Sequence, residues 1–178
     1  VRAMIEFGVI RIRDDASLVD ARNKLRHFVL ALQVDAITAT RIAVAASAQC
    51  RRMMRHSRET RIAVGVESSG DDPRLVLTFQ ASAGLDRDPM LEAVFDGAAA
   101  AHGGNLRVSR RLRHARFQPS ADFVAEQRQR IERRSRTELL LEVREQNEAL
   151  ARHRDQLEQT VAERTVELKG ATAAAEEA

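Results

Sequence analysis

The stretch TRIAVGVESSGDDPRLVLTFQ, residues 60–80, carries the clearest fold signal in the chain. Residues 60–67 and 74–80 are rich in Val, Ile, Leu and Thr, as β-strands are. The intervening SSGDDP is a turn: its Gly can adopt positive φ, and its Pro fixes its own φ. The sequence therefore predicts a β-hairpin at this point.

Upstream of the hairpin, the pattern predicts one strand and two helices. Residues 3–13 alternate well enough to form a strand, and Asp14 or Asp15 can cap the helix that follows. A second helix is expected from Asp35 to about His56, with small residues suited to close packing. The first helix has one apolar face at helical spacing, made of Leu18, Ala21, Leu25, Phe28, Val29 and Leu32.

Downstream of the hairpin, we expect a third helix and two short strands. The helix is predicted over residues 90–101, ended by Gly103 and Gly104, and the strands over 106–109 and 114–118. The order βααββαββ indicates an α+β two-layer sandwich, with helices on one face of a largely antiparallel sheet. We assign this domain to residues 1–119.

Composition limits the classes of function. The chain has 178 residues, 3% aromatics and a single cysteine, with no Cys/His cluster at metal-ligand spacing. No apolar run is long enough to span a bilayer and no signal-peptide pattern opens the chain, so we expect a cytoplasmic protein with no membrane partner. The chain ends inside a helical pattern, which suggests a fragment of a longer protein.

Charge is distributed unevenly along the chain. Residues 121–178 hold 10 basic and 13 acidic side chains, so the remainder, with 19 basic and 13 acidic, has a net charge of +6. Basic clusters could meet phosphates, but no aromatics interleave them for base stacking, so we expect a solvated face and no nucleic-acid partner. The clusters are Arg51, Arg52, Arg55 and Arg58, and Arg107, Arg110, Arg111, Arg113 and Arg116.

The composition changes after Pro119, and residues 120–178 follow a heptad rhythm. This predicts a long α-helix forming a parallel, dimeric coiled coil; a single helix folded back on the domain is the alternative. Asn147 at a core position favours an in-register pair, whereas Arg154 and Arg164 interrupt the seam. The predicted dimer seam is Leu140, Val143, Asn147, Leu150, Leu157, Val161 and Leu168.

Two stretches resemble the GHKL ATPase superfamily, and in particular its anti-sigma-factor serine kinases. TRIAVAASAQCRR (40–52) is similar to the helix that carries a Glu and, four residues later, a magnesium-holding Asn. AHGGNLRVS (101–109) is similar to a helix end and strand late in the ATPase domain of histidine kinases. The resemblance covers roughly residues 3–118 and implies a GHKL ATPase-like fold.

The catalytic groups of that family are missing. Ala48 stands where the family has its Glu, Arg52 where it has its Asn, and Gln80 where an Asp holds adenine; only Gly84 remains of the glycines that follow. A guanidinium repels a metal ion and cannot be its oxygen ligand. The glycine-rich phosphate lid is replaced by LDRDP (85–89). The resemblance therefore implies a pseudo-ATPase with no metal or cofactor, although Arg52 could contact a phosphate without magnesium.

A second resemblance lies in the C-terminal segment. LEQTVAERTVEL (157–168) looks like the signalling helix ahead of the phosphoacceptor helix in sensor histidine kinases, and similar linkers precede diguanylate cyclases and serine phosphatases. The family's phosphoacceptor His is absent, and we interpret His153 as a residue of the coil surface.

Together these patterns predict the regulatory, dimerising region of a cytoplasmic sensor histidine kinase in two-component signalling. The fragment itself is expected to be non-catalytic, with a protein partner on the globular domain and a histidine kinase core elsewhere in the parent protein. An anti-sigma-factor-type serine kinase or ATP-binding switch is the alternative. A nucleic-acid-binding module is a third hypothesis.

Overall fold

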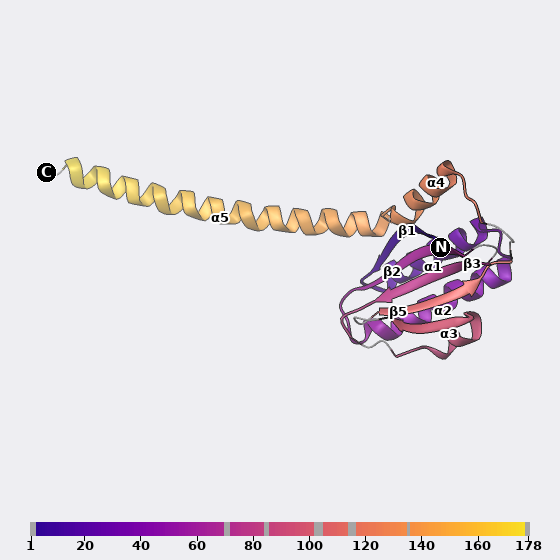
Figure 1. Ribbon diagram of the computed structural model, residues 1–178. Helices are drawn as coiled ribbons and strands as arrows, with labels where there is room; N and C mark the ends of the chain where they lie inside the picture. The colour runs from indigo at the N-terminus through magenta and orange to yellow at the C-terminus, as the bar shows by residue number, and fades with distance from the viewer. Residues whose placement is uncertain are drawn as a thin grey trace. The chain divides into compact units, whose positions relative to one another are not determined.

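Five strands form one antiparallel sheet in the order β1-β2-β3-β5-β4. The computed structural model describes residues 3–69, 72–83, 86–101, 105–113, 117–134 and 136–176. The strands are β1 (Ala3–Ile12), β2 (Thr60–Ser69), β3 (Asp72–Gln80), β4 (Gly97–Ala101) and β5 (Asn105–Arg111) (Figure 1). The hairpin predicted from residues 60–80 is confirmed, with Arg61 opposite Gln80 at its open end.

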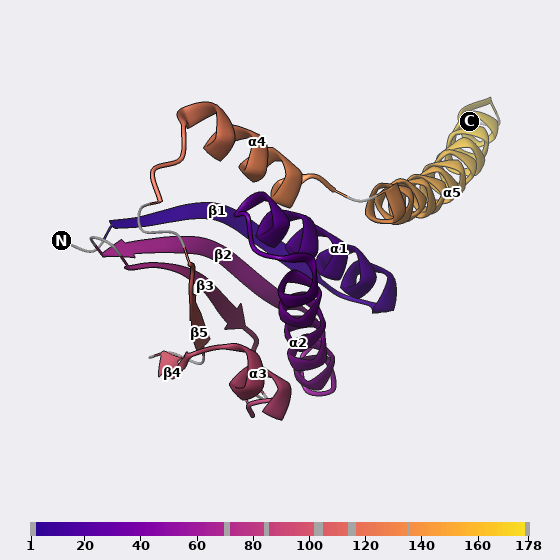
Figure 2. The ribbon, with the colours of Figure 1, turned by 90° about the vertical axis from the view of Figure 1, so that its right-hand side faces the viewer.

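Helices α1 (Asp15–Ala31) and α2 (Ala36–Met54) lie on one face of the sheet (Figure 2). The α+β class is therefore confirmed. Asp14 caps α1 by accepting the Ser17 backbone N–H at 2.7 Å, and the Ser17 hydroxyl accepts from Asp14 in return. The Ser17 hydrogen bonds lower the pKa of Asp14. Asp35 caps α2 by accepting from the Thr38 N–H at 2.9 Å.

The hydrophobic core fills the space between these two helices and the sheet. Aliphatic residues dominate it, and the apolar face predicted for the first helix is buried as expected. Phe7 of β1 stacks in a tilted arrangement on Phe28 of α1, with ring centroids 4.8 Å apart. The largest fully buried side chains include Phe7, Phe28, Phe79, Ile12, Leu18, Leu25, Ile42, Met53, Ile62, Leu75, Leu77 and Leu91.

The opposite face of the sheet carries ion pairs. Arg107 Nη2 lies 3.0 Å from Glu67 Oε2, and Asp72 joins both Arg74 (3.0 Å) and Arg111 (2.7 Å). Arg107 and Arg111, which belong to the second predicted basic cluster, thus already have carboxylate partners. An antiparallel sheet commonly has one such solvated face.

The predicted helix over residues 90–101 is wrong. Helix α3 (Pro89–Val94) ends early, and β4 takes up the second half of that range. Asp96 directs the change: its N–H donates to the Ser109 carbonyl at 3.0 Å, and its carboxylate accepts the Arg111 N–H at 2.7 Å. Gly103 and Gly104, predicted to end the helix, lie outside the described residues.

The last two predicted strands also need correction. The strand predicted at 106–109 is present as β5, but it is longer and runs between β3 and β4. Of the strand predicted at 114–118, residues 114–116 lie outside the described part of the chain, and Phe117 and Gln118 are not in a strand.

The predicted rod is divided into α4 (Ala121–Glu132) and α5 (Arg136–Glu176). The chain forms two compact units, Val1–Ser135 and Arg136–Ala178. Helix α4 packs on β1 and α1 and so belongs to the first unit. The boundary between the units therefore lies after α4, and not at residue 119 as predicted. Helix α5, the second unit, is a single helix of 41 residues.

Candidate functional site

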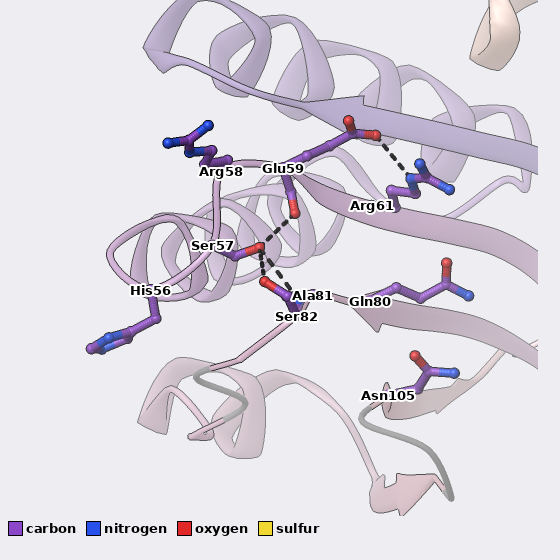
Figure 3. A pocket seen from close by; sticks show the side chains of 9 residues that line it. All are labelled: His56, Ser57, Arg58, Glu59, Arg61, Gln80, Ala81, Ser82 and Asn105. Atoms are coloured by element: carbon purple, nitrogen blue, oxygen red, sulfur yellow. Dashed lines mark hydrogen bonds and ion pairs between the residues drawn. The ribbon is translucent and has the colours of Figure 1, made fainter.

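An open pocket of about 710 Å³, lined mostly by polar residues, lies at the end of the sheet where β3 ends and β2 and β5 begin (Figure 3). Three segments supply its walls: the loop from α2 into β2, the loop after β3, and the start of β5. Its lining residues are His56, Ser57, Arg58, Glu59, Arg61, Gln80, Ala81, Ser82 and Asn105.

Ser57 holds the pocket wall together. Its hydroxyl hydrogen-bonds the Glu59 carbonyl at 2.8 Å and the Ser82 hydroxyl at 2.9 Å, and it accepts the Ser82 N–H at 3.4 Å (Figure 3). The side chain thereby ties the loop after α2 to the loop after β3. These bonds occupy the serine oxygen, and we assign Ser57 a structural role.

Among the described residues that line the pocket, Glu59 is the one carboxylate, and arginines neutralise it. Glu59 accepts a hydrogen bond from Arg61 Nε at 2.9 Å and lies 3.5 Å from Arg13 Nε. The bond from Arg61 lowers the pKa of Glu59, so this group stays ionised at neutral pH. An ionised, paired carboxylate is a poor general acid, and the lining residues that the structure describes include no second carboxyl group with which to divide acid and base roles.

Arg61, Gln80 and Asn105 are register partners and form one row across β2, β3 and β5. In Figure 3 the Gln80 and Asn105 carboxamides point the same way, while His56 and Arg58 point away from them. Across the described ranges, neither carboxamide has a side-chain hydrogen bond. The row offers hydrogen bonds to a polar ligand, but the charged groups diverge and do not converge on one anion.

The predicted residues on α2 lie elsewhere. Arg52 Nη1 is 3.9 Å from Asp88 Oδ2, and neither Arg52 nor Ala48 lines the pocket. Gln80 does line it, and Gly84 lies outside the described residues. The structure therefore does not gather Ala48, Arg52 and Gln80 into one pocket in the part of the chain it describes.

Gln49, which the sequence analysis missed, organises this side of α2. It is fully buried; its Nε2 donates to the Asp86 carbonyl at 3.0 Å and its Oε1 accepts the Asp88 N–H at 2.7 Å. The residues just before α3 are thus held directly against α2. A lone Gln among the small apolar residues of this helix was the available signal.

In the part of the chain that the structure describes, other reactive groups give no further site. Cys50 is buried, and burial raises the pKa of its thiol to about 12, which leaves it unreactive at neutral pH. Among the residues described, no cluster of three His, Cys, Asp or Glu could hold a metal ion. In the same residues, no helix combines the length and apolarity needed to cross a membrane.

Helix α5 displays the predicted seam on its surface. Val143 and Leu157 are each 52% exposed, and Leu150 is 65% exposed. Leu140, Val161 and Leu168 are exposed to a similar extent, and Asn147 lies on the surface with them. A helix in water rarely leaves an apolar row of this length uncovered, even one with polar interruptions.

No model of a known protein family matches this chain, and no curated protein matches it.

Proposed function

We propose that this chain is the regulatory and dimerising region of a cytoplasmic bacterial sensor histidine kinase, and that it has no catalytic activity of its own. The observation that carries the proposal is the exposed heptad row along the 41 residues of α5. An apolar row of this kind is covered when two copies pair as a coiled coil. The globular unit would then act as an input domain with a GHKL ATPase-like ancestry.

The α2 region supports the absence of ATPase chemistry. In the resembling family, the position of Arg52 holds magnesium through an Asn, whereas here its guanidinium faces Asp88. Gln49 also fixes the backbone of residues 86–88 against α2. A segment tied down in this way is a poor substitute for a phosphate lid that must close over a nucleotide.

Nucleotide binding separates this proposal from the serine-kinase alternative. Titration of the chain with magnesium ATP by calorimetry is expected to give no heat of binding at micromolar concentrations. Low-micromolar affinity would contradict the pseudo-ATPase assignment. In that case Arg52→Asn, which restores the family's ligand type, would be compared with wild type for a gain in affinity.

Cysteine cross-linking tests the parallel dimer. Leu150→Cys and Leu157→Cys place thiols at seam positions, where a parallel pair brings each close to its own copy. Gln159→Cys lies on the outer side of the helix and is the matched control. Cys50 need not be removed, because it is buried with a pKa of about 12. We expect rapid disulfide formation at 150 and 157 and little at 159; equal rates at all three positions would refute the parallel seam.

The polar positions of the seam suggest how a signal passes. Asn147, Arg154 and Arg164 weaken the packing of an otherwise apolar interface. In the single helix, Arg154 is turned toward Asp155 (2.9 Å) and Glu158 (3.7 Å). Polar residues at these positions lower the free-energy cost of sliding or rotating one helix of the pair against the other. Events at the input domain could then shift the equilibrium between two arrangements of the coiled coil.

A further inference from the structure

Helix α4 is attached to the edge strand β1 by a closely fitted apolar contact. Ile131 is 1% exposed, and Phe123 meets Phe7 edge to face at 6.4 Å. Gly8, which has φ of +130° in a bulge of β1, makes this approach possible. A Cβ at Gly8 would lie 2.9 Å from Glu132 Cγ and 3.3 Å from Ile131 Cγ2.

Polar contacts hold the C-terminal end of α4. Lys24 of α1 donates to the carbonyl of Arg133 at 2.5 Å, and Arg128 Nε donates to the carbonyl of Glu6 at 2.9 Å. The lysine is itself fixed by Asp20 at 3.0 Å. Arg133 has φ −60° and ψ 122°, so the chain leaves the helix at the residue whose carbonyl Lys24 holds.

The sequence itself does not require the helix to end there. From Ala121 to Lys169 the chain contains neither Gly nor Pro. Most residues across the junction are good helix formers, and a continuous helix would place Glu132 four residues before Arg136, a favourable spacing for an ion pair. No Gly or Pro stops α4 at this point. Its contacts with β1 and α1 therefore fix its end, together with the stretch SRTE (135–138), whose Ser and Glu have the spacing of a capping box that starts a new helix.

We propose that α4 is a releasable latch: when it leaves β1, α4 and α5 join as one continuous helix. The docked form is the resting state. In a continuous helix, Ile131 would lie about 150° around the axis from the first seam residues, Leu140 and Val143, since successive residues turn by 100°. Coiled-coil pairing could not bury it, and release requires a partner that covers the exposed face of α4 or competes for β1.

The latch depends only on α4, its contacts and the junction sequence. Its use in signalling rests on the proposed function, because lengthening the helix would then change the coiled coil that leads to the kinase core.

Distance measurement within one chain tests the latch. Spin labels at Ala125→Cys and Arg152→Cys are 27 residues apart. A continuous helix would separate their backbones by about 40 Å, at 1.5 Å per residue. Labelled chains are diluted with excess unlabelled chains, so that electron–electron double resonance reads distances within one molecule whether or not it dimerises.

Ile131→Glu removes the buried contact and suits a solvent-exposed helix. We expect it to raise the population with a narrow separation near 40 Å at least tenfold over wild type. The double variant Ile131→Glu with Arg134→Pro should lose that population, because proline interrupts the new helix while remaining compatible with the extended backbone of Arg133. Arg130→Ala, which removes an exposed pair with Glu126, is the matched control and should resemble wild type.

If α4 unwinds in Ile131→Glu and no 40 Å population appears, the latch is refuted. Lys24→Ala provides a second arm that leaves the core intact; it should raise the same population and slow amide exchange across residues 133–136. If Lys24→Ala neither raises the 40 Å population nor slows this amide exchange, the latch is also refuted. Size-exclusion chromatography with light scattering on the same samples reports dimerisation separately, so failure of the dimer and failure of the latch are distinguishable.

Discussion

At the scale of single residues, the buried thiol of Cys50 gives a stability that depends on pH. Its pKa is raised from an ordinary 9.0 to about 12 in the folded chain. The unfolded chain therefore releases this proton at lower pH than the folded one. The contribution is complete below pH 9 and is lost as pH rises from 9 towards 12.

We expect the free energy of unfolding to fall by about 1.4 kcal/mol per pH unit in that window through this group alone. Urea titrations from pH 8 to 11 on wild type and Cys50→Ala would measure it. The chain has no Tyr and only two lysines, Lys24 and Lys169, so little else titrates there. A difference between the two chains that does not change with pH would contradict the assignment.

Burial of the Thr60 hydroxyl lowers the stability of the fold. Its hydroxyl is fully buried and has no hydrogen-bond partner of normal geometry among the described residues, and its interaction with the Cys50 thiol is weak. Thr60→Val should stabilise the fold by about 1 kcal/mol and raise the Tm by about 4 °C. Calorimetry against Thr78→Val, a half-buried position on the polar face of the sheet, provides the comparison. A lower Tm would show that the hydroxyl is satisfied.

At the scale of elements, sequence reasoning succeeded where local pattern and packing agree. Apolar and turn patterns, with a helix cap at Asp14 or Asp15, predicted the first strand, both long helices and the hairpin close to their observed bounds. It failed at residues 97–101, where an alanine run favours helix but Asp96 and β5 impose a strand. It also missed the end of α4, where the chain contains neither Gly nor Pro.

At the candidate site, too, sequence reasoning failed where a residue's surroundings depend on distant parts of the chain. A resemblance could point to Ala48, Arg52 and Gln80, but it could not show that Arg52 faces Asp88 while Gln80 lines a pocket with Ser57 and Asn105. Those placements depend on register across three strands and on loops whose course no local pattern fixes. The role of Gln49 depends on backbone groups 37 and 39 residues away.

Gln49 should control the loop before α3. Gln49→Ala removes one donor and one acceptor and leaves two backbone groups of residues 86 and 88 without partners. We expect a loss of about 2 kcal/mol and at least tenfold faster amide exchange in residues 86–94, with β2 and β3 unchanged. Gln49→Glu keeps the acceptor for Asp88 but loses the donor, and should be intermediate. Equally faster amide exchange throughout the globular unit would indicate that the substitution destabilises the whole fold instead.

At the scale of the whole molecule, the two units should be separable. A chain ending at Arg134 retains the sheet, α1, α2 and the docked α4. We expect it to unfold in one cooperative transition and to sediment as a monomer, whereas the full chain sediments as a dimer. Leu150→Asp with Leu157→Asp in the full chain is the control that removes the seam without shortening the molecule. Dimerisation of the truncated chain would place the interface on the globular unit.

The brevity of the junction between α4 and α5 has a consequence for avidity. Only residues 133–135 separate the two helices. Even fully extended, this linker keeps the last residue of α4 within about 14 Å of the first residue of α5. In a parallel pair, both input domains would be confined near the same end of the coil, at a local concentration in the millimolar range. A ligand with two weak binding epitopes would then hold such a dimer far more tightly than it holds either domain alone.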